Sequence, residues 1–352
     1  MIYKRHYLKE LFLVFTFVIS ACYFLYVLID CSSNPKLFQS SSLHLWDILL
    51  YYFYQFSQHA EILIPIALLL SALKVILTAN VQREILALLA AGLSLKKITR
   101  PFLLFALLIM SLCYLNYEFL QPTIYLKLAE FEKIHLDKQL PSDHGIVHPL
   151  TLEDHSLLIY NYFDPIQNQI HDLFWQKSTK DIYKIRQLDL TKRPPTGYQI
   201  DHLVRKNSKL TLVKHYDSLP FHAMILPKDL TSLFRPAKWQ SLSGLAQLIP
   251  LHDLFNLNDK QASITTFFLY KLTMPLVVLL VVVAPLCYLM RYSRKVSPFL
   301  IYGLSLFFYI TFFTMLKASV ILGENQILHP LVAICVPMAS LLLLFGYKYA
   351  KL

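Results

Sequence analysis

The hydrophobic positions of the chain are concentrated in six long runs. Five of these runs contain no Asp, Glu, Lys or Arg, and the sixth contains only Lys74. The uncharged runs are residues 11–29, 102–117, 272–290, 296–316 and 327–347, and the run with Lys74 is 62–82. Crossing a bilayer as a helix takes roughly 20 mostly apolar residues. The pattern therefore predicts six membrane-spanning helices, in two groups of three.

A polar segment, residues 122–262, separates the two groups of runs. It contains short stretches of strand-like composition: GIVHPLTL, HSLLIYNYF, IHDLFWQKS, IYKIRQLDLT, QIDHLVRK and KLTLVKHY. Turn-forming residues, such as the Pro-Pro-Thr-Gly cluster at 194–197, separate several of them at a spacing typical of antiparallel sandwiches and open barrels. We predict an all-β domain here, entered through a helix over 122–138 and left through a helix or loop over 240–262.

These elements describe a membrane α-helical protein with three helices on each side of an inserted all-β domain. We expect the first three helices in residues 1–121, the all-β domain in 122–262 and the last three helices in 263–352. A short additional helix is expected at 82–91. The first apolar run is longer than the core of a typical signal peptide and lacks a small-x-small cleavage site, so we interpret it as a membrane helix.

The net charge of +11 is unevenly distributed along the chain. Segment 122–262 holds 17 basic and 15 acidic residues, whereas the rest of the chain holds 16 and 7. The excess basic residues flank alternate apolar runs: Lys4, Arg5, Lys9, Arg83, Lys96, Lys97, Arg100, Arg291, Arg294, Lys295, Lys348 and Lys351. By the positive-inside rule, both termini and the 83–100 connector face the cytoplasm, and 122–262 lies outside. This distribution provides no basic face for a nucleic acid.

The motifs of several common enzymatic chemistries are missing from the sequence. It has no G-x-x-x-x-G-K-[ST] phosphate loop, no H-E-x-x-H and no G-x-S-x-G. His144 and His148 have a spacing that suits a metal on a helix, but Gly145 and the two β-branched residues after it favour an extended segment. Most of the cysteines fall in apolar runs and are interpreted as small buried hydrophobes. We expect no enzymatic activity, metal or cofactor.

The connector between the second and third apolar runs reads QREILALLAAGLSLKKITRP, residues 82–101. Helical spacing gives it two faces, one with Glu84, Ala87 and Ala91 and the other with Ile85, Leu88 and Leu89. Gly92 is a typical helix stop. The apolar face fits against the membrane helices, and the small-sided face allows a partner to approach closely. From spacing alone, an ordinary amphipathic interfacial helix and a docking helix for a second protein both remain open.

This connector resembles the cytoplasmic connector of the lipopolysaccharide-export permease family LptF/LptG, also called YjgP/YjgQ. The matching positions are Glu84, Ala87, Ala90, Ala91, Gly92, Ser94, Ile98 and Pro101. Leu89 departs from the family pattern, which often has arginine there. The layout of three helices, an outer β-rich domain and three helices is also similar to the family, as are Asn116, Pro122 and the K-L-x-x-P-L motif at 271–276.

The resemblance implies a permease subunit of an ABC-type exporter in the bacterial inner membrane, with a β-jellyroll-like domain in the periplasm. It implies a pair of related permeases, LptF and LptG, bound to a dimer of the separate ATPase LptB. It also implies a periplasmic bridge that begins with LptC, and lipopolysaccharide as the exported substrate. Arg83, Glu84, Ala87, Ala91 and Gly92 would form the ATPase-coupling element, with Glu84 as its acidic contact.

Three lysines are candidates for contact with the phosphates of the lipid. Lys271 and Lys317 lie near the outer ends of the fourth and fifth predicted helices, and Lys36 lies in the first outer connector. Lysines in membrane spans are costly and usually have an anionic partner. The lipid phosphates are candidate partners for all three, with snorkelling to ordinary headgroups as the alternative. Snorkelling is the interpretation that we favour for Lys74.

Two further groups of residues lie on the predicted outer side. Glu61 and Glu118 lie near the outer membrane surface, where we expect them to be solvated. Six apolar residues of the β-rich segment suit either a lipid-lining trough or a closed core: Leu157, Ile159, Phe174, Ile185, Leu203 and Leu212.

Other functional classes remain as alternatives to a lipopolysaccharide exporter. A permease of the lipoprotein-release type generally has four spans with the large insert after the first, which the three-plus-three layout disfavours. A membrane scaffold that transports nothing is a second alternative. A secondary transporter is disfavoured because the apolar runs contain few acidic residues for ion coupling.

Overall fold

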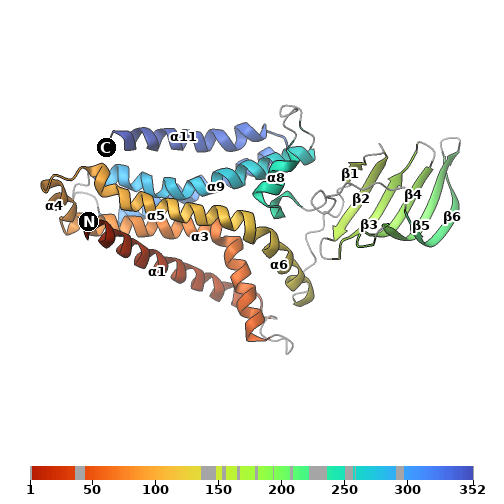
Figure 1. Cartoon of the computed structure of the whole chain (residues 1–352), viewed down its shortest axis with the longest axis horizontal. Helices are drawn as coiled ribbons and strands as arrows, with labels where there is room; N and C mark the ends of the chain where they lie inside the picture. The colour runs from red at the N-terminus through yellow and green to blue at the C-terminus, as the bar shows by residue number, and fades with distance from the viewer. Residues whose placement is uncertain are drawn as a thin grey trace. The chain divides into compact units, whose positions relative to one another are not determined.

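The structure is a computed structural model of the 352-residue chain. It describes residues 2–35, 44–135, 148–152, 156–164, 167–178, 181–192, 194–206, 209–221, 236–249, 257, 259–290 and 297–351. These residues form two compact units, one of Met1–Tyr125 with Ser241–Leu352 and the other of Leu126–Gln240. We refer to them as the helical unit and the sheet unit (Figure 1). Lys36 and His144 lie outside the described residues.

Six helices in the described part of the chain are long and apolar enough to cross a membrane, which confirms the predicted spans. The long helices are α1 (Ile2–Ser33), α3 (Leu45–Val81), α5 (Leu95–Leu115), α9 (Asp259–Leu289), α10 (Pro298–Glu324) and α11 (Pro330–Ala350). A π-helical turn, η1 (Asn116–Leu120), continues α5 into α6 (Gln121–His135). The short elements are α4 (Glu84–Ala90), the 3₁₀ turn η2 (Ala237–Trp239) and α8 (Leu242–Leu248).

Helices α3 and α9 form the centre of the helical unit. The most apolar windows of α3 and α9 are each 61% buried by the protein, against 11% for α1 and for α10. The buried side chains, such as Leu73, Ile76 and Val282, belong to one continuous core. The exposed faces of the outer helices are also apolar, which suits lipid as their surroundings.

Hydrogen bonds connect the ends of the long helices near α4. Figure 1 shows α4 at the same end of the helical unit as the start of α1 and the end of α11. The Asn80 side chain donates a hydrogen bond to the Leu289 carbonyl at 2.9 Å, and Lys96 donates to the Ala350 carbonyl at 2.8 Å. The opposite end of the unit, which we call the far end, contains η1, α8, the start of α9 and the end of α10 (Figure 1).

The sheet unit contains one six-stranded antiparallel sheet, in which every strand pairs with its sequence neighbours. The strands are β1 (His148–Thr151), β2 (Leu157–Asp164), β3 (Gln169–Gln176), β4 (Asp181–Asp189), β5 (Thr196–Lys206) and β6 (Lys209–Pro220). All six predicted stretches therefore form strands, and the inserted all-β domain is confirmed. Among the described residues the strands make one sheet rather than the two packed sheets of a sandwich.

The alternation of the sheet is interrupted in its middle strands. Asp172 in β3 and Gln199 in β5 have positive φ values of 49° and 51°. Because of this interruption, the side chains of Ile170 and Leu173 belong to the same buried cluster, although the two residues are three positions apart. Of the six apolar residues with two interpretations, Ile185 lies in this core, and Phe174 and Leu212 are exposed. Leu157, Ile159 and Leu203 are half-buried, and the register pairs them with exposed or half-buried partners.

Candidate functional site

The helix α4 is limited at both ends by residues in left-handed conformation. Arg83 precedes it with φ 61°, and Gly92 follows it with φ 81°. The N–H of Gly92 donates to the Leu89 carbonyl at 2.9 Å, and the N–H of Leu93 donates to the Leu88 carbonyl at 3.1 Å, which closes the C-terminus of the helix. Glycine adopts such a φ without steric cost, so Gly92 fixes where α4 ends.

The faces of α4 differ in part from the prediction. Ile85 is buried and Leu88 is half-buried, as expected for the packed face. Leu89, which we predicted on that packed face, is 37% exposed. A helix of seven residues, about two turns, can bury only a narrow stripe, and Ile85 and Leu88 already occupy it. The open surface therefore carries leucines beside the small residues, and consists of Leu86, Ala87, Leu89, Ala90 and Ala91.

Glu84 is not a free acidic residue at the start of α4. Its side chain is half-buried, and its Oε2 accepts a hydrogen bond of 3.1 Å from the Tyr7 hydroxyl of α1. Tyr7 is itself buried, with its ring 5.8 Å from the ring of Phe102 in α5. The contact joins the first helix to α4 across 77 residues of sequence, and nothing in the local pattern indicated it.

A second cluster of polar residues lies around Glu61, in the half of the helical unit towards the far end. Lys317 of α10 places its Nζ 2.5 Å from Glu61 Oε1. The hydroxyls of Tyr117 in η1 and Tyr270 in α9 donate to Glu61 Oε2 at 3.3 and 3.2 Å. Four elements that are distant in sequence, α3, η1, α9 and α10, therefore meet at one carboxylate.

The two predicted lysines described by the structure both reach this cluster. Lys317 Nζ lies 4.7 Å from the centre of the Tyr270 ring and 5.4 Å from that of Phe313. Lys271 Nζ lies 5.9 Å from the centre of the Tyr117 ring. Lys271 is only 2% exposed, so a lipid phosphate could reach it only after the helices around it separate. Lys317 is the more accessible of the two, with 40% of its side chain exposed.

The predicted solvated environment was wrong for Glu61, whereas Glu118 is partly exposed but has specific partners. The Glu61 side chain is 19% exposed and ion-paired, because three donors from other elements surround it. Glu118 accepts a hydrogen bond of 3.1 Å from the Ser243 backbone N–H and another from the Ser243 hydroxyl, at the start of α8. The position of each glutamate in the sequence was clear, but most of the donors come from residues more than a hundred positions away.

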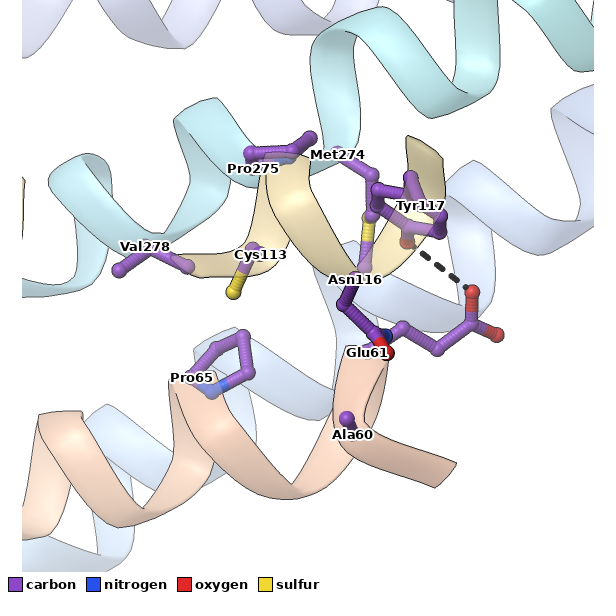
Figure 2. A pocket seen from close by; sticks show the side chains of 9 residues that line it. All are labelled: Ala60, Glu61, Pro65, Cys113, Asn116, Tyr117, Met274, Pro275 and Val278. Atoms are coloured by element: carbon purple, nitrogen blue, oxygen red, sulfur yellow. Dashed lines mark hydrogen bonds between the residues drawn. The ribbon is translucent and has the colours of Figure 1, made fainter. Parts of the chain in front are cut away.

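A small pocket opens beside Glu61 (Figure 2). Its lining residues come from α3, α5, η1 and α9: Ala60, Glu61, Pro65, Cys113, Asn116, Tyr117, Met274, Pro275 and Val278. Pro65 has no N–H and therefore leaves the Glu61 carbonyl without its helical donor. On the facing wall, the π-helical turn η1 begins at Asn116. Both walls are thus interrupted helices, and such interruptions are frequent at functional sites.

Side-chain hydrogen bonds hold these two interrupted helices together. Ser57 of α3 donates to Asn116 Oδ1 at 2.6 Å, and Asn116 Nδ2 donates to the Ser57 carbonyl at 3.3 Å. On the other side of the cluster, the Tyr309 hydroxyl of α10 donates to the Ile62 carbonyl at 3.4 Å. The backbone near the α3 interruption is therefore supported by side chains from neighbouring helices, as membrane proteins require.

Comparison with known protein families shows which family contains this chain. Residues 5–351 match the family described as lipopolysaccharide export system permease LptF/LptG. The chain belongs to this family. The match includes residues of both the helical unit and the sheet unit. No curated protein matches the chain.

Membership in the LptF/LptG family defines the class of the protein. It is a multi-pass inner-membrane component of a lipopolysaccharide export system. A permease of this kind is a transporter component rather than an enzyme, and it works with other proteins of its export system.

Proposed function

We propose that this LptF/LptG permease carries lipopolysaccharide out of the inner membrane with energy supplied by a separate ATPase of the LptB type. The observation that carries the proposal is α4, a short helix fixed between Arg83 and Gly92 whose open surface is made of alanines and leucines. A short, sharply delimited helix beside both chain ends suits a docking element because its position is defined by the helices around it. In this proposal α4 and both termini face the cytoplasm, and the sheet unit lies in the periplasm.

The coupling element consists of Arg83, Glu84, Ala87, Ala91 and Gly92. The small alanine side chains allow a groove of the ATPase to approach the helix closely, and Leu86 and Leu89 add apolar contact area. A carboxylate accepts hydrogen bonds at two oxygens. Glu84 Oε2 accepts a hydrogen bond from the Tyr7 hydroxyl, and we expect Oε1 to accept one from a basic side chain of the ATPase. Glu84 would then connect the ATPase directly to α1.

Lys271 and Lys317, the proposed substrate-contacting residues that the structure describes, lie in the half of the helical unit away from α4. Lys317 is the first candidate for a lipid phosphate because its side chain is partly exposed and lies on an otherwise apolar helix. Lys271 is a candidate only in a state where α9 has moved away from η1. Lys36 stays a candidate from its position in the sequence. A second, related permease and a periplasmic bridge protein of the LptC type complete the proposed exporter.

The lipid-export proposal is tested by purification of the chain in mild detergent after co-expression with the ATPase of its own export system. We expect a soluble ATPase subunit to co-purify with the wild-type chain and to be lost from Glu84→Lys, which reverses the charge at the docking helix. Glu10→Lys is the matched control, since Glu10 is also half-buried and lies on α1 at the same end of the unit. This control should retain the ATPase.

Two results would contradict the proposal at different levels. Retention of the ATPase by Glu84→Lys would remove Glu84 from the docking surface. Absence of any ATPase from the wild-type preparation would contradict the proposal that export is driven by an ATPase, and would favour a non-transporting scaffold. A scaffold also predicts that Glu84→Lys leaves the export of lipopolysaccharide intact, which a complementation assay measures directly.

A further inference from the structure

Glu61 is held in place independently of Lys317. Its Oε2 accepts hydrogen bonds from Tyr117 and Tyr270, which belong to different elements, while its Oε1 faces Lys317. Loss of the lysine would leave both tyrosine contacts in place. The carboxylate is therefore the fixed member of the ion pair, and its orientation does not depend on the cation.

Lys317 has the opposite character. Its ammonium group ends a flexible four-carbon stem, and 40% of its side chain is not covered by the protein. The rings of Tyr270 and Phe313 lie beside the Nζ, at 4.7 and 5.4 Å from it, and offer a surface over which a cation can move. Lys317 can therefore turn towards an external anion without any movement of Glu61.

An unpaired lysine within a membrane span is costly. A lysine that binds and releases an anionic lipid consequently needs a second partner for the empty state. Glu61 is within reach for this purpose and is kept ready by the two tyrosines. We propose that Glu61 is the resident counter-ion of Lys317, which it gives up to the phosphate of an anionic lipid headgroup and takes back when the lipid leaves.

This inference rests on the proposed contact between Lys317 and the lipid, and it adds a release step to that contact. The phosphate and Glu61 compete for one ammonium group. The apparent affinity for lipid is therefore the intrinsic affinity multiplied by the fraction of time for which the ion pair is open. Re-formation of the pair then favours departure of the lipid. A purely structural ion pair, which the lipid does not open, has no such effect on affinity.

The experiment measures equilibrium binding of fluorescent diphosphoryl lipid A to the detergent-purified full chain with its co-purifying partners. Three variants are compared with the wild type: Glu61→Gln, Lys317→Gln and the double variant. The amide introduced by Glu61→Gln keeps an acceptor for the tyrosines but lacks the charge that holds Lys317. We expect Glu61→Gln to bind the lipid at least threefold more tightly, and Lys317→Gln to bind it about tenfold more weakly.

The double variant separates exchange from simple charge repulsion. If Glu61 acts by competing for Lys317, removal of its charge has no effect once the lysine is gone, so the double variant should bind within twofold of Lys317→Gln. An equal gain from Glu61→Gln in both backgrounds would mean that Glu61 merely repels the phosphate, and would overturn the exchange. Dephosphorylated lipid A should bind the wild type and Glu61→Gln equally, and a gain for that probe also would overturn it.

The outcomes also distinguish this inference from the function on which it rests. If Lys317→Gln binds lipid A as the wild type does, the proposed lipid contact of Lys317 fails, and the exchange fails with it. If Lys317→Gln binds more weakly but Glu61→Gln shows no gain, the lipid contact stands and the exchange is overturned. Inorganic phosphate serves as a separate probe, and displacement of lipid A by it would assign the site to a free anion instead of a headgroup.

A variant that retains the charge guards against a folding defect in Glu61→Gln. Glu61→Asp keeps the carboxylate but shortens its reach towards Lys317, so it should also bind lipid A more tightly than the wild type, by a smaller factor. Thermal unfolding provides the second measurement. Lipid A should raise the Tm of Glu61→Gln by more than that of the wild type, because only the variant lacks a partner for Lys317 in the empty state. An equal rise in both would contradict the exchange.

Discussion

The hydroxyl of Tyr7 donates a hydrogen bond to the carboxylate of Glu84, and this bond attaches the first membrane helix to α4. Tyr7 is buried against α5, so a force on α4 at Glu84 would be passed to two membrane helices and not to a flexible loop. The permease thus has a defined physical connection between its proposed docking helix and its membrane core.

Tyr7→Phe tests this connection, because it removes the hydroxyl and keeps the ring packing. We expect the ATPase still to co-purify, while lipid-stimulated ATP hydrolysis by the purified complex falls severalfold. Loss of the hydrogen bond should lower the free energy of unfolding by about 1 kcal/mol. Tyr3→Phe, one helical turn earlier on α1, is the control and should change neither quantity. Unchanged hydrolysis in Tyr7→Phe would show that the bond transmits nothing.

Gly92→Ala tests the end of α4. Apart from Gly92 itself and its chain neighbours, no atom would lie within 4 Å of an added Cβ, so the cost of the substitution is the φ of 81°, which should destabilise the protein by about 1 kcal/mol. The helix would be free to extend, and ATPase co-purification should decrease. Gly346→Ala in α11 also meets no atom within 4 Å but lacks a positive φ, so it should be neutral or stabilising. Equal Tm changes in the two variants would contradict this explanation.

The proposed orientation is tested by labelling single cysteines in intact spheroplasts with a membrane-impermeant maleimide. Gln167 lies exposed between β2 and β3, and Gln82 lies exposed beside α4. In a background without the native cysteines, Gln167→Cys should be labelled from outside and Gln82→Cys only after lysis. The reverse pattern would place the sheet unit in the cytosol and remove the proposed direction of export.

The sheet unit should lose stability at high pH. Burial, with the neighbouring Asp181 carboxylate and Tyr216, raises the pKa of Tyr183 above its ordinary value. A raised pKa means that the neutral phenol is favoured in the folded state, so its contribution is complete below about pH 10 and is lost as the pH rises through the folded-state pKa. Tyr183→Phe should flatten this fall in unfolding free energy. A pH profile of the variant that matches that of the wild type would refute the assignment to Tyr183.

The sequence alone determined the elements of this protein. The length of the uncharged runs requires membrane helices, since backbone groups in lipid must be hydrogen-bonded within the segment. The β-branched and aromatic stretches between turn formers similarly predicted all six strands. Gly92 marked the end of α4 because its special backbone freedom is a property of the residue itself. Each of these inferences depends on neighbours within a few positions of the chain.

The tertiary structure decided which charges meet. Glu61 and Lys317 are 256 residues apart, and no local pattern distinguishes a solvated glutamate from one that three other elements surround. It also decided that Leu89 of α4 is exposed, and that Ile185 belongs to the core of the sheet whereas Phe174 does not. These outcomes depend on how whole helices and strands pack, because hydrogen bonds act over about 3 Å and only the folded chain brings such partners that close.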